Sequence, residues 1–115
     1  MSRIISVHEY RLSPSTDRNQ FERAIRNAER RGLLQLPGLL DHYFLRGIRG
    51  ARSGEYAAVW VYESRKAWNR LWGPVARPSP KQDYPSNWKL WEDEVLAPFL
   101  AEDPDHIAFT AYEQL

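Results

Sequence analysis

The sequence contains no cysteine, and this absence rules out several kinds of site at once. Disulfide frameworks, thiolate metal centres and cysteine nucleophiles are all excluded. Long apolar runs are also missing: none approaches the ~18 residues of a membrane-spanning helix, and the first residues lack the apolar core of a signal peptide. The net charge is only +1, which argues against nucleic acid or an anionic membrane as a partner. We therefore expect a cytoplasmic protein.

The composition that remains is that of an ordinary globular protein, with 43% hydrophobic and 27% charged residues. A length of 115 residues corresponds to a single domain, residues 1–115, that can bury a real core. Four of the eight prolines fall within residues 73–87, which predicts a loop inserted into this domain. A loop of that length is either a lid over a binding site or a surface insertion, and the sequence leaves both alternatives open.

Seven segments show the residue spacing of regular secondary structure. The clearest is 17–32, where Phe21 and Ile25 belong to a stripe of apolar residues that recurs every three or four positions. Pro98 is expected to kink the last helix or to end it early. The predicted strands are 3–12, 41–50, 55–63 and 106–115, and the remaining helices are 64–73 and 87–103.

The predicted order is β-α-β-β-α-β, with the proline-rich loop interrupting the second helical part. This is the ferredoxin-like α+β fold, a four-stranded antiparallel sheet with its first and third strands in the middle and both helices on one face. A central strand covered on only one face should alternate apolar with polar residues. The segment 56–62 (YAAVWVY) is instead apolar on both sides. Because a monomer rarely exposes so large an apolar face, we expect a homodimer in which two sheets face each other.

At this point the chain resembles the dimeric α/β-barrel superfamily, particularly its antibiotic-biosynthesis monooxygenase-like members. The resemblance rests on the strand–helix start, on "LPGLLDHYFLRG" (36–47) and on "VWVYESRKAWNRLW" (59–72). It implies a dimeric α/β barrel, in a group that includes cofactor-free oxygenases of polycyclic phenols, haem-degrading enzymes and effector-binding modules. Two departures stand out: the loop 73–87 is longer than the compact pattern, and 64–73 lacks the histidine with which haem-degrading relatives bind iron.

The parity of each strand selects the candidate site residues. We expect the more aliphatic side of each strand, such as Val59 and Val61, to pack under the helices, and the opposite side to face the partner sheet. By the resemblance, Trp68 and Trp72 lie near the position at which relatives place substrate-stacking aromatics. The predicted substrate contacts on the strands are Phe44, Trp60, His42, His106 and Tyr112.

Four further residues, on the same strand faces as the predicted substrate contacts, are candidates for catalysis. His8 is the predicted general base, because the ordinary imidazole pKa lies near neutrality. Tyr10, Tyr62 and Arg46 would stabilise the developing oxyanion of a substrate. The alternatives are structural: tyrosines half-buried at the dimer interface with hydrated hydroxyls, and Arg46 in a salt bridge across the dimer.

The remaining candidates also have structural interpretations. Trp68 and Trp72 are spaced as helix core residues. A metal triad of His8, His42 and His106 would require three distant strands to converge, and the sequence holds no short-spaced pair of ligands. We therefore expect neither a metal nor a cofactor.

These observations predict a protein that binds a small organic ligand and is, if an enzyme, a cofactor-independent monooxygenase of an aromatic or phenolic substrate. A non-catalytic module that binds a ligand or only dimerises is the rival interpretation. Haem binding is a third, which the missing histidine in 64–73 weakens.

Overall fold

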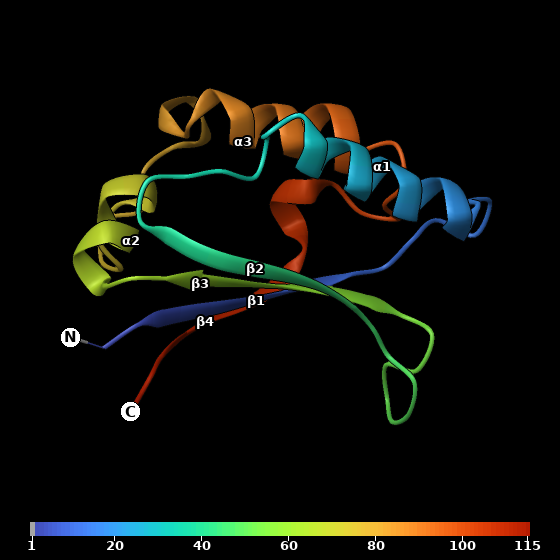
Figure 1. Cartoon of the computed structure of the whole chain (residues 1–115), viewed down its shortest axis with the longest axis horizontal. Coiled ribbons are helices and arrows are strands. Elements are labelled where there is room, and N and C mark those ends of the chain that lie inside the picture. The colour runs from blue at the N-terminus through green and yellow to red at the C-terminus, as the bar shows by residue number, and fades with distance from the viewer. Residues whose placement is uncertain (1) are drawn as a thin grey trace.

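The computed structural model describes residues 2–115 as a layer of helices packed on one face of a sheet (Figure 1). Four strands form the sheet: β1 (Ile4–Tyr10), β2 (Leu39–Arg46), β3 (Tyr56–Tyr62) and β4 (Ala108–Glu113). The helices are α1 (Arg18–Arg30), α2 (Arg65–Trp72) and α3 (Ser86–Leu90), and α3 continues into a π-helix over Trp91–Leu96, here called the π segment. Two short 3₁₀ turns lie at Lys81–Asp83 and Pro104–His106. No helix within residues 2–115 has the length and apolar character needed to cross a membrane.

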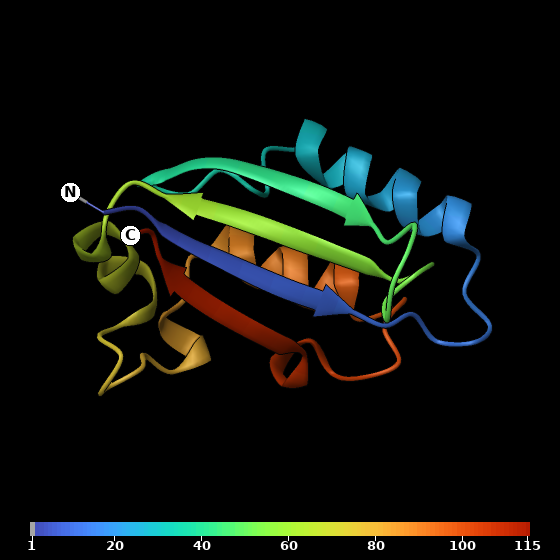
Figure 2. The same cartoon turned by 90° about the horizontal axis from the view of Figure 1, so that it is seen from below.

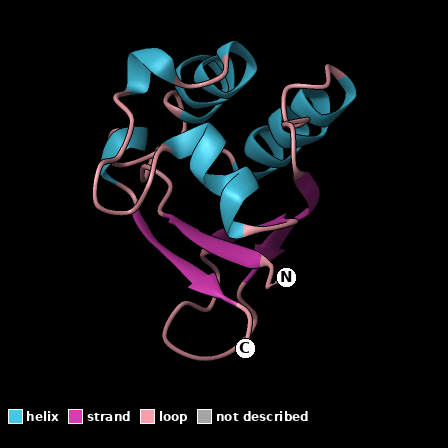
Figure 3. Ribbon diagram, turned by 90° about the vertical axis from the view of Figure 1, so that its left-hand side faces the viewer, coloured by secondary structure: helices cyan, strands magenta, loops and turns pink. Residues whose placement is uncertain are grey.

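The strands lie in the order β2-β3-β1-β4, and every neighbouring pair is antiparallel (Figure 2). The first and third strands therefore occupy the middle of the sheet, and the helices cover one face (Figure 3). In the central pair, Val7 lies opposite Val59, and His8 lies opposite Ala58. The predicted ferredoxin-like α+β fold is confirmed.

Local signals set the ends of the first two helices. The Asp17 carboxylate caps α1 by accepting a hydrogen bond of 2.8 Å from the backbone N–H of Asn19. The Ser64 hydroxyl caps α2 by accepting a 3.1 Å hydrogen bond from the backbone N–H of Ala67. Gly73 ends α2 with φ at 82°, a backbone conformation that favours glycine. Both helices begin and end close to the predicted residues.

The third helical part differs from its prediction. Segment 87–103 is predicted to be helical, with Pro98 kinking it or ending it early; the α-helix ends at Leu90, and the π segment that continues it ends at Leu96. Its second half is π-helical, so one extra residue fits into the turn. Both Trp91 and Glu92 are buried, and with Trp88 and Val95 they have the i, i+3, i+4, i+7 spacing of one helix face.

The core lies between the sheet and the helices and is unusually aromatic. Trp60 on the central strand β3 has no solvent exposure at all. Its ring packs against Trp88 of α3 with centroids 4.9 Å apart and nearly perpendicular planes. The largest fully buried side chains are Tyr10, Phe21, Trp60, Tyr62, Trp91 and Leu96.

On β1, β2 and β3 the side that packs under the helices is the opposite of the one predicted, whereas the last strand has the predicted orientation, with Phe109 on the covered side. On β3 the aromatic residues Trp60 and Tyr62 are buried, whereas Val59 and Val61 lie on the face without helices. On β2, Tyr43 and Leu45 are exposed instead of lying under the helices. The helix side of β1 carries Ile4, Ser6, His8 and Tyr10.

The reason for this reversal is the amount of surface that each side chain buries. An aromatic ring buries ~150–250 Å², more than a valine can, so rings fill the deep gap between sheet and helices best. The smaller β-branched residues suit a flat sheet surface. The site residues predicted on β1, β2 and β3 therefore lie on the covered side of the protomer's own sheet.

The uncovered face of the sheet, here called the open face, is also apolar, as the sequence predicts. Val7 and Val59 lie at its centre, with Tyr43 and Leu45 toward the β2 edge. The hairpin loop 47–55 curls back below this face in Figure 1, where Arg52 forms an ion pair with Glu9 at 3.1 Å. Residues of one sheet thus form two apolar faces, only one of which is covered.

Candidate functional site

A row of aromatic rings crosses the covered face of the sheet, with one ring from each strand. Phe44 of β2 packs on Trp60 of β3 with centroids 5.7 Å apart, and Trp60 packs on His8 of β1 at 5.8 Å. His8 in turn contacts Phe109 of β4 at 5.6 Å. Phe109 is 60% exposed, so the row is buried in the middle and reaches the surface at the β4 edge.

The polar groups nearest this row come from β1 and from the third helical part. His8 and Tyr10 are two residues apart on β1 and therefore point to the same face. Trp88 and Glu92 are one helical turn apart above them, and Trp88 contacts His8 with centroids 6.1 Å apart. Glu92 in turn lies close enough to Tyr10 for its charge to raise the pKa of that hydroxyl. We call the site formed by His8, Tyr10, Trp88, Glu92 and Phe109 the β1 niche.

His8 is a neutral imidazole in this setting. Rings of Trp60, Trp88 and Phe109 surround it, and burial lowers its pKa to about 4. At pH 7 the ring can therefore accept a hydrogen bond or a proton, but it is a weaker base than an ordinary histidine.

Several buried polar atoms on the covered side have no hydrogen-bond partner within the described chain. Burial of such atoms is unfavourable, so each one calls for an explanation. Tyr10 is completely buried, and burial is the main cause that raises the pKa of its hydroxyl, followed by the charge of Glu92. The atoms between the sheet and the third helical part are Tyr10 Oη, Trp60 Nε1, Trp91 Nε1 and Glu92 Oε1.

Glu92 is a candidate site residue that the sequence analysis missed. Burial raises its pKa to about 7; the Lys81 ammonium opposes this rise, and the charges of Asp105 and Asp93 add to it. A signal was present in the sequence, because Glu92 interrupts the apolar stripe to which Trp88 belongs. An acid at such a position is a candidate for function.

Tyr62, a predicted catalytic residue, lies at the other end of the sheet. It pairs with Ile4, whereas Tyr10 pairs with Tyr56, so the two tyrosines are separated by about six residues along the strands, or ~20 Å. Burial raises the pKa of Tyr62, with a hydrogen bond from Trp72 opposing the rise. The structure does not bring Tyr62 and Tyr10 together.

The two tryptophans of α2 differ in position. Trp68 packs against the core and is partly buried, as its structural interpretation expects. Trp72 contacts Trp88 at 5.2 Å and Tyr84 of the proline-rich loop at 5.1 Å. Trp72 therefore connects the loop to the wall of the β1 niche.

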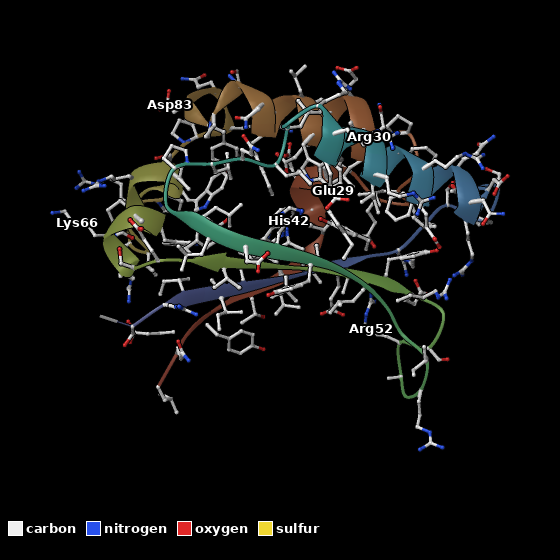
Figure 4. All side chains as sticks on the ribbon, viewed as in Figure 1. Glu29, Arg30, His42, Arg52, Lys66 and Asp83 are labelled. Atoms are coloured by element: carbon white, nitrogen blue, oxygen red, sulfur yellow. The ribbon has the colours of Figure 1, made fainter. Side chains whose placement is uncertain are left out.

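His42 and Arg46 lie at the β2 edge and bind residues of α1. The His42 ring stacks on Trp60, and its Nε2 lies 2.8 Å from a carboxylate oxygen of Glu29 (Figure 4). Arg46 pairs with Glu22 at 3.4 Å, so its ion pair is formed within the chain, whereas the structural alternative placed it across a dimer.

A groove of about 330 Å³ lies beside these ion pairs, between α1 and β2. Ile25 and Phe44 supply apolar lining, and Arg46 and Glu22 supply charge. A second, smaller groove of about 200 Å³ lies near Arg11 and Ile107. Neither groove is lined by His8, and side chains fill the space over the middle of the aromatic row.

Two predicted site residues lie outside the covered face. His106 is exposed in the 3₁₀ turn before β4, and the predicted strand starts only at Ala108. Tyr112 pairs with Ile5 and so lies on the open face. The three histidines therefore do not converge, and residues 2–115 contain no group of three or more histidine, aspartate or glutamate side chains arranged to hold a metal ion.

A scan of known protein families gives no match to this sequence, and neither does a search of curated proteins. Solved structures do match over nearly the whole chain. A putative antibiotic biosynthesis monooxygenase from Bordetella bronchiseptica has 13% identity and a TM-score of 0.67, covering 100% of this chain and 99% of that one. A dimeric ferredoxin-like protein from Thermobifida fusca has 16% identity and a TM-score of 0.55, covering 98% and 90%. SnoaB, a cofactor-independent oxygenase from Streptomyces nogalater, has 13% identity and a TM-score of 0.52, covering 100% and 93%.

At these identities the likeness concerns the fold. The resemblance inferred from the sequence is confirmed at that level: the chain has the ferredoxin-like fold of antibiotic biosynthesis monooxygenase-like proteins. The arrangement of its own residues has to supply any argument about chemistry.

Proposed function

We propose that this protein binds a small planar phenol in the β1 niche and oxygenates it without a cofactor. The observation that carries the proposal is the set of buried, unpartnered polar atoms beside an aromatic wall, which includes Tyr10 Oη and Glu92 Oε1. Aromatic rings can stack on a planar ligand, and the polar atoms can bind its hydroxyl group. The fold shared with a cofactor-independent oxygenase is consistent with this activity.

The chemistry needs only a phenol and O2. After deprotonation, the electron-rich phenolate passes one electron to O2, and the resulting radical pair combines to form a carbon–oxygen bond. Loss of water from the peroxide then gives a quinone, so one oxygen atom of O2 enters the product and the other leaves as water. His8 can accept the phenol's hydrogen bond, while the Tyr10 hydroxyl donates to the developing oxyanion.

We further propose that two protomers pair through their open faces. Val7, Val59 and the neighbouring apolar residues form a surface that a monomer would leave in water. A structure of the same fold is described as dimeric. The ligand site would then lie within each protomer, on the opposite side of its sheet.

The non-catalytic alternative also has an observation in its favour. Side chains fill the interior over Trp60, and the larger groove lies at the β2 edge, away from His8. In this second proposal the protein binds a ligand in that groove, or only dimerises, and performs no oxidation.

Oxygen uptake with 1,5-dihydroxynaphthalene distinguishes the two functions. An oxygenase converts this diol and one O2 into a hydroxynaphthoquinone and water, at a saturable rate above that of the uncatalysed reaction. With ¹⁸O2, one labelled atom should appear in the quinone. Quenching of tryptophan fluorescence without oxygen uptake would support the binding module, and the absence of both would contradict ligand binding in the niche.

A further inference from the structure

Glu92 is an acid in a position where an apolar residue would be more stable. It lies in the apolar stripe of the third helical part and is only 7% exposed, whereas its neighbours Asp93 and Glu94 are exposed. Its Oε1 atom has no hydrogen-bond partner within residues 2–115. Burial of a carboxylate without hydrogen bonds destabilises a fold, so stability does not explain the presence of this residue.

Lys81 does not satisfy this carboxylate. Its Nζ lies 3.7 Å from Glu92 Oε1, which is too long for a hydrogen bond. The ammonium instead donates to Asp93 at 2.7 Å and to Asp105 at 2.9 Å. The charge of Lys81 therefore attracts the Glu92 carboxylate, but the Oε1 atom remains without a hydrogen bond.

The other groups that face Glu92 are hydroxyls. Tyr84 of the proline-rich loop and Tyr10 of β1 both have their pKa raised, first by burial and then by the charge of Glu92. Tyr10 Oη and Trp91 Nε1 have no hydrogen-bond partner in the described chain. The free carboxylate oxygen of Glu92 and the free hydroxyl of Tyr10 thus offer one acceptor and one donor, which matches the needs of a phenol as it becomes a phenolate.

We infer that Glu92 is the catalytic base that takes the proton from the bound phenol, an inference that rests on the proposed function. The free carboxylate oxygen accepts the hydroxyl proton, and the electron pair of the O–H bond stays on the ligand oxygen. Tyr10 Oη donates a hydrogen bond to that oxygen, and the Glu92 carboxylate, rather than His8, accepts the single O–H group of the phenol. The phenolate then reacts with O2 as described above.

The relative basicities of the two candidates favour Glu92 over His8. A general base works best when its pKa lies near the working pH. The pKa of Glu92 is raised to about 7, whereas that of His8 is lowered to about 4. At neutral pH the carboxylate is therefore the stronger proton acceptor of the two.

The ionisation of a bound probe tests this inference without turnover. Under anaerobic conditions, 1,5-dihydroxynaphthalene is titrated with the wild type, and its absorption shows whether it binds as phenol or as phenolate. The wild type should bind it as phenolate near neutral pH. Glu92→Gln should bind it as neutral phenol with an affinity within about threefold, and in air its oxygen uptake should fall about a hundredfold. Glu94→Gln, on the same helical part but exposed, is the matched control and should behave as the wild type.

The possible results separate this inference from the function on which it rests. If Glu92→Gln still binds the diol as phenolate, the assignment of Glu92 alone is overturned. Loss of the phenolate in His8→Gln alongside that result would point to His8 as the base. A wild type that binds no diol would overturn the proposed function together with this inference. A melting temperature of Glu92→Gln above that of the wild type at pH 8 would support a functional rather than a stabilising role, and a large decrease would contradict it.

Discussion

His8 and Glu92 share one niche, but their protonation affects stability in opposite directions. The ordinary pKa of 6.5 for His8 is lowered to about 4 in the fold, so the unfolded chain binds more protons between these values. His8 therefore makes the fold less stable as the pH falls through this range. The ordinary pKa of 4.5 for Glu92 is raised to about 7, so Glu92 makes the fold less stable as the pH rises through that range.

Replacement of His8 should change how the stability of the fold depends on pH. We expect His8→Gln to gain stability relative to the wild type as the pH is lowered from 7 to 4.5, because the buried imidazole no longer has to stay neutral. The gain should be on the order of 2 kcal/mol. Chemical denaturation at a series of pH values measures it. His106→Gln, at an exposed histidine, is the control, and parallel profiles for His8→Gln and the wild type would contradict the burial of His8.

At the residue scale the sequence predicted which strand residues share a face better than which face that is. Strand periodicity places His8, Tyr10, Phe44 and Trp60 on one side of the sheet, and the structure confirms that they share a face. Which face this is depends on how much surface each side chain buries, and the assumption that aliphatic residues lie innermost was wrong here. Glu92 was detectable as an acid in an apolar stripe, but its missing hydrogen bond required the structure.

At the scale of elements, the proline-rich loop is tied to two other parts of the chain by a single side chain. Lys81 lies in the 3₁₀ turn of this loop and bonds to Asp93 of the π segment and to Asp105 of the turn before β4. Tyr84 of the same loop packs on Trp72, which contacts Trp88 of the β1 niche. The proline-rich loop is thus held beside the β1 niche. This favours the interpretation of the loop as a lid over a binding site rather than as a surface insertion.

Replacement of Lys81 by an uncharged residue should loosen the proline-rich loop. In Lys81→Gln, we expect backbone amides of residues 73–87 to exchange with deuterium several-fold faster, because the ion pairs to Asp93 and Asp105 are lost. Hydrogen–deuterium exchange followed by mass spectrometry measures this. Lys66→Gln removes an exposed lysine of α2 as a control. Equal exchange in the two variants would show that Lys81 does not hold the loop.

Element positions were largely predictable because they follow from local signals. The cap Asp17, the cap Ser64 and the terminator Gly73 act through neighbouring residues, and the structure uses all three. The π segment was not predictable, because apolar spacing does not distinguish it from an α-helix: Trp88, Trp91 and Val95 have the spacing of an ordinary helix face.

At the scale of the whole molecule, the two faces of the sheet carry different groups of residues. The covered face holds the aromatic row and the β1 niche, while the open face is apolar and carries none of the catalytic candidates. The sequence analysis placed ligand and partner on the same face, so that loss of the dimer would also abolish the site. In the structure the β1 niche and the open face lie on opposite sides of the sheet.

This separation leads to a prediction about a variant that cannot dimerise. Val59 lies opposite Val7 at the centre of the open face, so Val59→Lys would place two charges in the interior of a sheet-to-sheet interface. We expect the wild type to sediment as a dimer at micromolar concentration and Val59→Lys as a folded monomer. Asn27→Lys, on the exposed surface of α1, should remain dimeric.

The same variant separates the two faces functionally. Because the β1 niche is built from β1, β4 and the third helical part of one protomer, monomeric Val59→Lys should still bind 1,5-dihydroxynaphthalene with an affinity within a few-fold of the wild type. Fluorescence titration at concentrations where sedimentation shows a monomer measures this affinity. Loss of binding in a monomer that keeps the wild-type circular dichroism spectrum would mean that the partner completes the site, and the niche would then have to be sought at the interface.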